Sequence, residues 1–197
     1  MTYLAIVDDG SLADFLEEHP EAADEVGFLH LYFAGERGVR PADSFSDRAL
    51  HDLARSMMSR HCDIHTRRLW IGCSWDILHW LLSPERRSGT VDGSDPGTRA
   101  IRCDQPLHPL AVATQGIPIR YLPALEVAQV ASWISGITAD RFREIYARLA
   151  REASAVYKFS PQDAAAASEE VCRRFLLLRE FYWIAAGHEE AVLAVLD

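Results

Sequence analysis

The amino-acid sequence predicts an α+β fold, in which a small mixed or antiparallel sheet packs against several helices within a single domain covering residues 1–197. Two apolar runs typical of strands, at 3–7 and 191–196, stand near the two ends of the chain. Between them, several segments repeat apolar residues at helical spacing, and a glycine separates two further strand-like runs. A chain of 197 residues, of which 49% are hydrophobic, can bury a core without a metal or a disulfide.

The N-terminal third begins with the strand at 3–7, which a helix starting at Ser11 follows. Ser11 has an aspartate three positions later, the spacing of a capping box, and the helix is expected to end near Pro20. The apolar run 27–35 is bounded by glycines, and its pattern does not distinguish a strand from a buried helix. Residues 47–58 carry leucine, alanine and methionine at helical spacing and predict a second helix.

The central region combines a strand, a helix and a long connection. "RLWIG" at 68–72 predicts a strand, and Ser74 is placed to cap the helix "WDILHWLLS" that follows it. Residues 83–106 contain glycine, proline and charged residues without apolar periodicity. They predict a long loop, which is uncommon in a compact domain and is often either mobile or functional.

The C-terminal half carries a predicted hairpin and three predicted helices. "LAVAT" and "IPIRYL" flank Gln115 and Gly116, so residues 109–122 are expected to form a hairpin in which glycine supplies the positive φ of the turn. Gly136 is expected to end the first helix, and Ser160 with a proline behind it to begin the last. The three helices are expected over residues 123–135, 139–156 and 160–186.

The predicted core consists of the apolar residues on the inward-facing sides of these strands and helices. Removing such side chains from water is the main favourable contribution to the free energy of folding. The predicted members are Leu69, Ile71, Leu78, Leu82, Val112, Val127, Val130, Ile134, Phe142, Ile145, Phe175, Leu178, Tyr182 and Val192.

The charge balance argues against one class of partner. A net charge of −9 repels a phosphate backbone at long range, so nucleic-acid binding is not expected. Nearly all of the twenty basic residues are arginine, with Lys158 the only lysine. That bias reflects either genome composition or the recognition of anions.

The sequence indicates a cytoplasmic protein that does not enter a membrane. Its first residues, "MTYLAIVDDG", have neither the basic region nor the cleavage site of a signal peptide. No apolar run reaches the roughly 18 residues that a membrane-spanning helix needs. In that compartment the four cysteines, Cys62, Cys73, Cys103 and Cys172, are expected to be reduced thiols.

Four segments occur in an order that is more specific than any one of them: "WIGCSWDILHWLLS", "PLAVATQG", "IRYLPALEVAQVASWISGIT" and "LLLREFYWIAAGHEEAVLAVL". Through them the chain resembles the YfbM-like family, small bacterial proteins with a domain of unknown function, over about residues 70–197. The first sixty residues match poorly. The chain departs from the family where Ile71, Gly72 and Cys73 replace acidic and lysine residues. The resemblance implies a small α+β domain and supplies no catalytic residue.

The segment "HCDIH" carries a possible metal-ligand pattern. His61 and His65 are four positions apart, so on a helix they would share a face, as in the zinc motif H-E-x-x-H. The third ligand would come from Cys62, Asp63 or Cys73. However, the glutamate of that motif is absent, and no second ligand cluster accompanies the pair. A solvated turn before the next strand is the favoured interpretation, and no cofactor is expected.

The helix after residue 74 carries the preferred candidate for a ligand pocket. Trp75 and His79 are i,i+4 neighbours, and so are Asp76 and Trp80. If one face of the helix lined a cleft, aromatic walls, a carboxylate and an imidazole would converge there. A core helix with a hydrogen-bonded histidine is the favoured alternative, but the long connection 83–106 directly follows this segment.

Two further groups of residues have a chemical and a structural interpretation. Cys73 precedes a predicted helix, a position typical of reactive cysteines, with His79 as the nearest base, but core packing is favoured. The cluster at the end of the last helix is likewise interpreted as core aromatics with surface charges: Glu180, Tyr182, Trp183 and His188. No glycine-rich phosphate loop and no G-x-S-x-G motif occurs, so nothing argues for nucleotide phosphates or a hydrolase triad.

Three functions remain open from the sequence. The favoured one is a cytoplasmic binding or interaction module without catalysis, whose partner would be a protein with a basic surface. The first alternative is a metal-assisted hydrolase that uses His61 and His65. The second is a sensor of a small ligand, with its pocket near Trp75 and His79.

Overall fold

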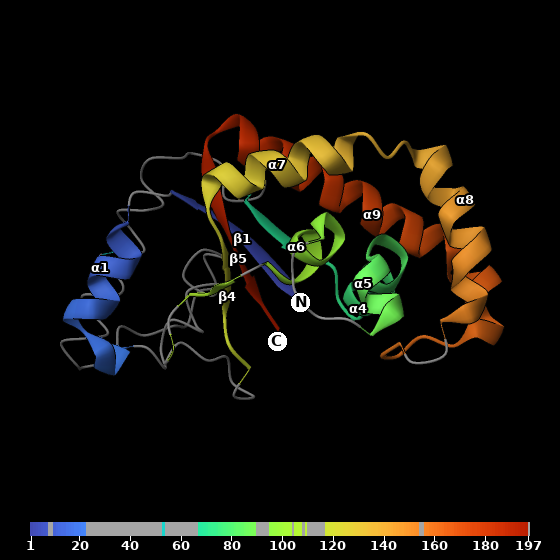
Figure 1. The fold of residues 1–197 in the computed structure, drawn as a ribbon, viewed down its shortest axis with the longest axis horizontal. Coiled ribbons are helices and arrows are strands. Elements are labelled where there is room, and N and C mark those ends of the chain that lie inside the picture. Colours follow the sequence, from blue (N-terminus) through green and yellow to red (C-terminus); the bar gives the residue numbers. More distant parts are fainter. Residues whose placement is uncertain are drawn as a thin grey trace, which may run out of the picture.

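The computed structural model describes residues 1–7, 10–22, 53, 67–89, 95–103, 105–107, 109, 117–153 and 156–196. Within these residues, one five-stranded sheet carries α-helices on both faces, which confirms the predicted α+β class (Figure 1). The predictions for 27–35, for almost all of 47–58 and for 110–116 concern residues outside the described part.

The sheet is antiparallel throughout, in the order β2-β1-β5-β4-β3. The two central strands, β1 (Thr2–Val7) and β5 (Glu190–Val195), are the first and last of the chain, as predicted. They pair from Thr2 opposite Val195 to Val7 opposite Glu190. The outer strands are β2 (Arg68–Trp70) beside β1, and β4 (Arg120–Leu122) and β3 (Gln105–Pro106) beside β5.

Both faces of the central strands are buried, which explains why their sequences are continuously apolar rather than alternating. Successive side chains of a strand point to opposite faces, so each strand contributes to two cores. The larger core contains Tyr3, Ala5, Val192 and Ala194 from the sheet, and the smaller core contains Leu4, Ile6, Leu193 and Val195. The smaller core is closed by α1 (Ser11–Glu18), which contributes Leu12, Phe15 and Leu16.

The other helices pack together over the larger core. They are α4 (Ser74–Leu82), α5 (Pro84–Ser88), α6 (Pro96–Arg102), α7 (Ala124–Ser135), α8 (Ala139–Leu149) and α9 (Ala164–Gly187). The long α9 runs beside α7 and also contacts α4 and α8, so it connects most of this layer (Figure 1). None of the described helices combines the length and the apolar character needed to cross a membrane.

The predicted core is confirmed for almost every described member. Of that set only Ile145 is half-buried, where it packs against the larger core, and Val112 lies outside the described residues. Phe142 of α8 and Phe175 of α9 stack with their ring centroids 3.9 Å apart. This pair fixes α8 against α9, because fully buried aromatic rings contribute both apolar area and a preferred geometry.

The prediction of a long loop over 83–106 was wrong. Ser83 caps α5 by accepting a hydrogen bond from the Arg86 amide, and Asp95 caps α6 by accepting from the amides of Gly97 and Thr98. Each cap is followed by a proline at the first helical position, where a missing N–H costs nothing. Helices of five and seven residues are too short to show an apolar period, so only their caps identify them.

Several predicted boundaries also needed correction. Gly10, with φ +77°, precedes α1 in place of the expected Ser11, and Cys73 precedes α4 in place of Ser74. The helix predicted over 139–156 ends at Leu149 and continues as a 3₁₀ turn, Ala150–Glu152. The last helix starts with another 3₁₀ turn, Pro161–Asp163, before α9. Of the predicted hairpin, β4 is present and pairs with β3, which lies upstream of the expected first arm.

Candidate functional site

A pocket of about 350 Å³ lies where α4, α5 and α6 meet the neighbouring strands β4 and β5. Helix α4 contributes Trp75, Asp76 and His79 to its wall, and three arginines from other elements complete it: Arg86, Arg102 and Arg120. Arg120 lies opposite Ala194 in the β4–β5 register, and the small alanine side chain leaves space beside the guanidinium.

The predicted ligand-binding set is thereby divided. Trp75, Asp76 and His79 line the pocket, whereas Trp80 does not. The Trp80 indole N–H donates to the Leu149 carbonyl at 3.4 Å, so this side chain joins α4 to the end of α8. An i,i+4 pattern places residues on neighbouring parts of a helix surface, but it does not show which neighbour faces a cleft.

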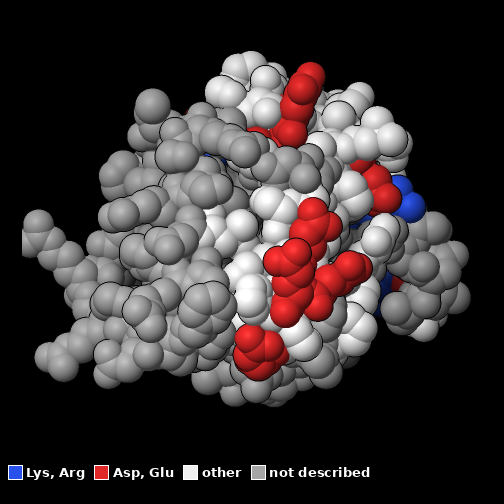
Figure 2. All heavy atoms as spheres, turned by 90° about the vertical axis from the view of Figure 1, so that its left-hand side faces the viewer, with Lys and Arg blue, Asp and Glu red and all other residues white. Residues whose placement is uncertain are grey.

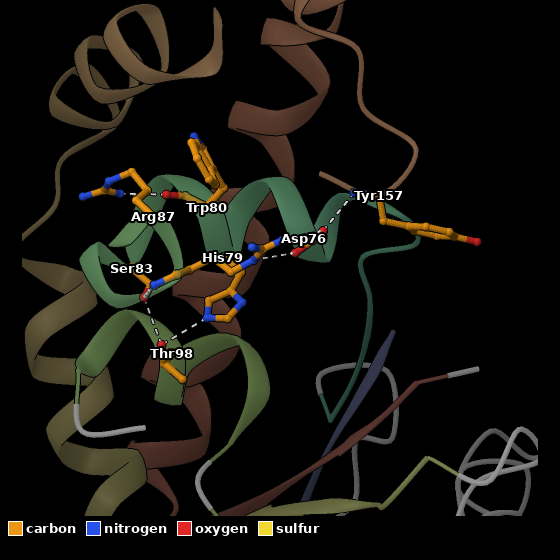
Figure 3. A network of polar contacts seen from close by, with 8 residues as sticks. Asp76, His79, Trp80, Ser83, Arg87, Thr98 and Tyr157 are labelled. Atoms are coloured by element: carbon orange, nitrogen blue, oxygen red, sulfur yellow. Dashed lines mark hydrogen bonds and ion pairs between the residues drawn. The ribbon is translucent and has the colours of Figure 1, made fainter. Parts of the chain in front are cut away.

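Asp76 is a buried carboxylate that holds two parts of the chain in place. Both of its oxygens accept from Arg86, with Nε and Nη2 each 3.3 Å away. Its Oδ2 also accepts from the backbone N–H of Tyr157 at 2.9 Å (Figure 3). The Asp76 carboxylate therefore positions the Arg86 guanidinium at the pocket and fixes the Tyr157 turn beside α4.

His79 is buried beneath the pocket, and its hydrogen bonds define its tautomer. Nε2 lies 3.0 Å from Thr98 Oγ1 (Figure 3). The Thr98 hydroxyl itself donates to Asp95 at 2.6 Å. Because a hydroxyl has one proton, Nε2 must be the donor to Thr98, which leaves Nδ1 as an acceptor. Burial, followed by the nearby Arg102 charge, lowers the pKa of His79 to about 4. The imidazole is therefore uncharged at neutral pH.

Asp95 anchors this network from the start of α6. Its carboxylate accepts from the hydroxyls of Ser83 and Thr98, at 2.7 and 2.6 Å, and from the amides of Gly97 and Thr98. Burial tends to raise the pKa of Asp95, but these hydrogen bonds together hold it below the ordinary value. The ionised carboxylate thus connects the end of α4 to α6 and orients the partner of His79.

Arg102, at the end of α6, is the least compensated charge of the pocket. Its guanidinium is half-buried, and among the described residues no hydrogen bond or ion pair engages it. Burial and then the neighbouring Arg120 charge lower the pKa of Arg102, although a guanidinium stays protonated at neutral pH. Like charges that approach each other in a partly dehydrated pocket repel, and a bound anion would relieve that repulsion.

A second cavity of about 450 Å³ adjoins the first. Both are lined by Met1, Trp75 and Leu196, and the second adds Trp70, Gly72, Cys73, Tyr157 and Lys158. Its walls are therefore largely aromatic. Cys73 is exposed at this cavity, so the expectation that it packs in the core was wrong. The hydrogen bond described for His79 goes to Thr98, and the basic group that interacts with the Cys73 thiol is Lys158.

A group of acidic side chains lies on another face of the molecule. Figure 2 shows Asp and Glu side chains along the face that carries α1. Asp14, Glu17, Glu18 and Glu21 are all exposed there. This helix covers the sheet face opposite to the one that carries the pocket. The protein thus has a basic pocket despite its net charge of −9. Binding of a basic protein partner to the acidic face stays a prediction.

Comparison with known proteins places this fold in a family. A family model described as a domain of unknown function, DUF1877, matches residues 2–195. The chain belongs to the DUF1877 family. This match includes almost all of the first sixty residues, for which the resemblance seen in the sequence was poor. Among solved structures, the DUF1877 chain is similar to YfbM from Escherichia coli, a protein of unknown function. The identity is 17%, the alignment covers 98% of this chain and 96% of that one, and the TM-score is 0.54. No curated protein matches.

The YfbM comparison shows the fold alone, and it bears out the YfbM-like resemblance. It assigns no role to the pocket of the DUF1877 chain. Sequence reasoning did not single out Arg86, Arg102 or Arg120, because they come from three separate elements and form no motif. The one available signal was the excess of arginine over lysine, for which anion recognition was one of two explanations.

The structure does not test the alternative of a metal site in the DUF1877 chain, and the solvated turn favoured from the sequence stays a prediction. His61, Cys62 and His65 lie outside the described residues. Across the parts of the chain that the structure describes, no group of three or more His, Cys, Asp or Glu side chains could hold a metal ion. Cys73, named as a possible third ligand, is a free thiol.

The aromatic cluster at the end of α9 divides between core and surface. Tyr182 is fully buried and its hydroxyl donates to the Ala100 carbonyl at 3.0 Å, as expected of a core residue. Trp183 is 68% exposed, so its assignment to the core was wrong. It lines a shallow cavity with Glu180, apart from the arginine pocket.

Proposed function

We propose that this DUF1877 protein binds a small dianionic ligand, of the charge type of a phosphate group, in the arginine pocket and does not transform it. The observation that carries the proposal is the half-buried guanidinium of Arg102, unpaired among the described residues, beside Arg86 and Arg120. Among the described lining residues three arginine side chains face one carboxylate, Asp76, and His79 is neutral, so basic side chains outnumber acidic ones.

A phosphate monoester carries about two negative charges at neutral pH and is therefore suited to a lining rich in guanidinium groups. Guanidinium groups present several N–H donors in a planar arrangement that fits the oxygens of phosphate or carboxylate. The pocket also excludes part of the bulk water, which strengthens such charge-assisted hydrogen bonds. A pocket of about 350 Å³ is within the size range of small-molecule sites.

The chemistry of the lining favours binding over catalysis. An imidazole with a pKa of about 4 is too weak a base to remove a proton from water or a hydroxyl at neutral pH. The Asp76 carboxylate already accepts from Arg86 and from the Tyr157 amide. The free acceptor of His79, Nδ1, is suited to receive a hydrogen bond from a ligand hydroxyl.

The test measures the affinity for inorganic phosphate and sulfate by isothermal titration calorimetry at constant ionic strength. We expect Arg102→Gln to weaken phosphate binding at least tenfold, about 1.4 kcal/mol, because a charge-assisted donor is lost. The matched control is Arg141→Gln, at an exposed arginine of α8 that pairs with Glu144, and it should leave the affinity unchanged.

Equal phosphate affinity in wild type and Arg102→Gln would contradict the proposed site. Hydrolysis of p-nitrophenyl phosphate by the wild type, lost in the Arg102→Gln variant, would contradict the absence of catalysis.

A further inference from the structure

The arginine pocket and the aromatic cavity share Trp75, whose half-buried side chain stands between them. They also share the carboxylate of Asp76 as a support. Asp76 accepts from the Arg86 guanidinium, which lines the pocket. It also accepts from the Tyr157 amide, whose residue lines the cavity (Figure 3). The two spaces are therefore adjoining parts of one site, and the same buried group sets their relative position.

The aromatic walls of the second cavity are held in place before any ligand binds. Trp70 is 55% exposed, yet the Arg174 guanidinium lies 5.2 Å from its ring centroid, and Arg174 Nη1 also donates to the Trp70 carbonyl. The same ring lies so close to Gly72 that an added Cβ would be 3.3 Å from it. A large aromatic side chain that is both exposed and fixed is suited to stacking with a ligand.

Tyr157 adds a second exposed ring to this cavity. It is 52% exposed, and its backbone is tied to α4 through Asp76. Lys158 Nζ lies over the Tyr157 ring, 5.2 Å from its centroid, so the lining of this cavity also contains a charged donor. A ring nitrogen or a carbonyl oxygen of a heterocycle can accept from this ammonium group, which an aliphatic chain cannot do.

From this arrangement we infer that the ligand is a phosphate monoester joined to a flat heterocyclic ring, the chemistry of a nucleoside monophosphate. The phosphate occupies the arginine pocket, and the ring lies in the aromatic cavity against Trp75, Trp70 and Tyr157. This inference rests on the proposed function, since it specifies the group attached to the dianion. Stacking on aromatic side chains tolerates different bases, because every base has a π face.

The experiment compares the affinities of inorganic phosphate, ribose 5-phosphate and the four ribonucleoside monophosphates, measured by calorimetry on the full chain. We expect at least one nucleotide to bind tenfold or more tightly than ribose 5-phosphate. Tyr157→Ala should remove most of that gain and leave the affinity for ribose 5-phosphate unchanged, because Tyr157 lines the cavity and not the pocket. Trp183→Leu, at an exposed tryptophan away from both, is the control.

The outcomes separate this inference from the proposed function. If all four nucleotides bind no more tightly than ribose 5-phosphate while phosphate binding still depends on Arg102, the ring assignment is overturned and the dianion site stands. An unchanged nucleotide affinity in Tyr157→Ala also overturns the assignment. If neither phosphate nor any nucleotide binds, both the inference and the proposed function are overturned.

Discussion

At the scale of single residues, His79 shows how burial selects one protonation state. Its ring lies under the arginine pocket, donates to Thr98 through Nε2 and is surrounded by charged groups of both signs. Burial and the Arg102 charge oppose protonation, and the Asp76 charge only partly offsets them. The neutral state leaves Nδ1 as an acceptor and adds no further positive charge beside the three arginines of the pocket.

This neutral state predicts a loss of stability in mild acid. The pKa of His79 is about 4 in the folded chain and near 6.5 when unfolded, so between these values the unfolded chain binds the additional proton. The free energy of unfolding should therefore fall as pH decreases from 6.5 to 4, by an amount on the order of 3 kcal/mol from this residue. Urea denaturation at several pH values should show a shallower loss in His79→Gln.

The control for this measurement is His19→Gln, at a histidine on the α1 side of the molecule. It should keep the steep pH dependence of the wild type. A His79→Gln variant whose stability falls as steeply as that of the wild type would show that His79 is not the group responsible.

At the scale of elements, the close approach of α6 to the end of α4 positions Arg102. Gly97, in the first turn of α6, is buried, and a Cβ added there would overlap the backbone carbonyl of Leu82. Asp95 holds the same two helices together through Ser83 and Thr98. A rigid backbone carbonyl cannot move aside as a flexible side chain would, so this contact requires glycine.

Gly97→Ala is accordingly expected to destabilise the fold by about 3 kcal/mol, the upper range for overpacking in a core. Because α6 must move away from α4, the variant should also weaken phosphate binding through displacement of Arg102. Gly187→Ala, at the end of α9 where no atom lies within 4 Å of the added Cβ, is the matched control and should change stability little. Denaturant titration of both variants checks this, and equal effects would rule out the steric explanation.

At the scale of the whole molecule, one sheet separates two cores. The larger core lies between the sheet and α4 to α9, and the smaller one lies under α1. Both use the same central strands, whose pairing joins the first and last described strands of the chain. From burial of this extent we expect a chain of 197 residues to be stable without a metal ion.

We therefore expect removal of divalent metals with EDTA to leave the melting temperature unchanged within about 1 °C. The double variant His61→Ala, His65→Ala should also melt like the wild type, because the cores do not depend on metal ligation. Differential scanning calorimetry and metal analysis of the purified protein test this. Stoichiometric zinc, lost in the double variant together with several degrees of melting temperature, would instead support the metal-assisted alternative.

Local patterns in the sequence were sufficient for most of the fold. The strands at both ends, the helix that stops at Gly136 and nearly all described core positions were predicted, because apolar period and glycine position depend on neighbouring residues. The caps were less reliable. Asp95 and Ser83 start two helices within a segment interpreted as a loop, since a capping residue is also a common turn residue.

The sequence by itself determined the α+β class, the family and the burial of α4. Only the tertiary structure decided which side chains meet at the pocket. Arg86, Arg102 and Arg120 lie on a short helix, at a helix end and on a strand, and they converge because α6 and β4 pack beside α4. Their grouping depends on packing between elements that are distant in the sequence. The period of apolar residues indicates only which residues share a face of one helix or strand. For that reason the acidic sequence did not reveal a basic pocket.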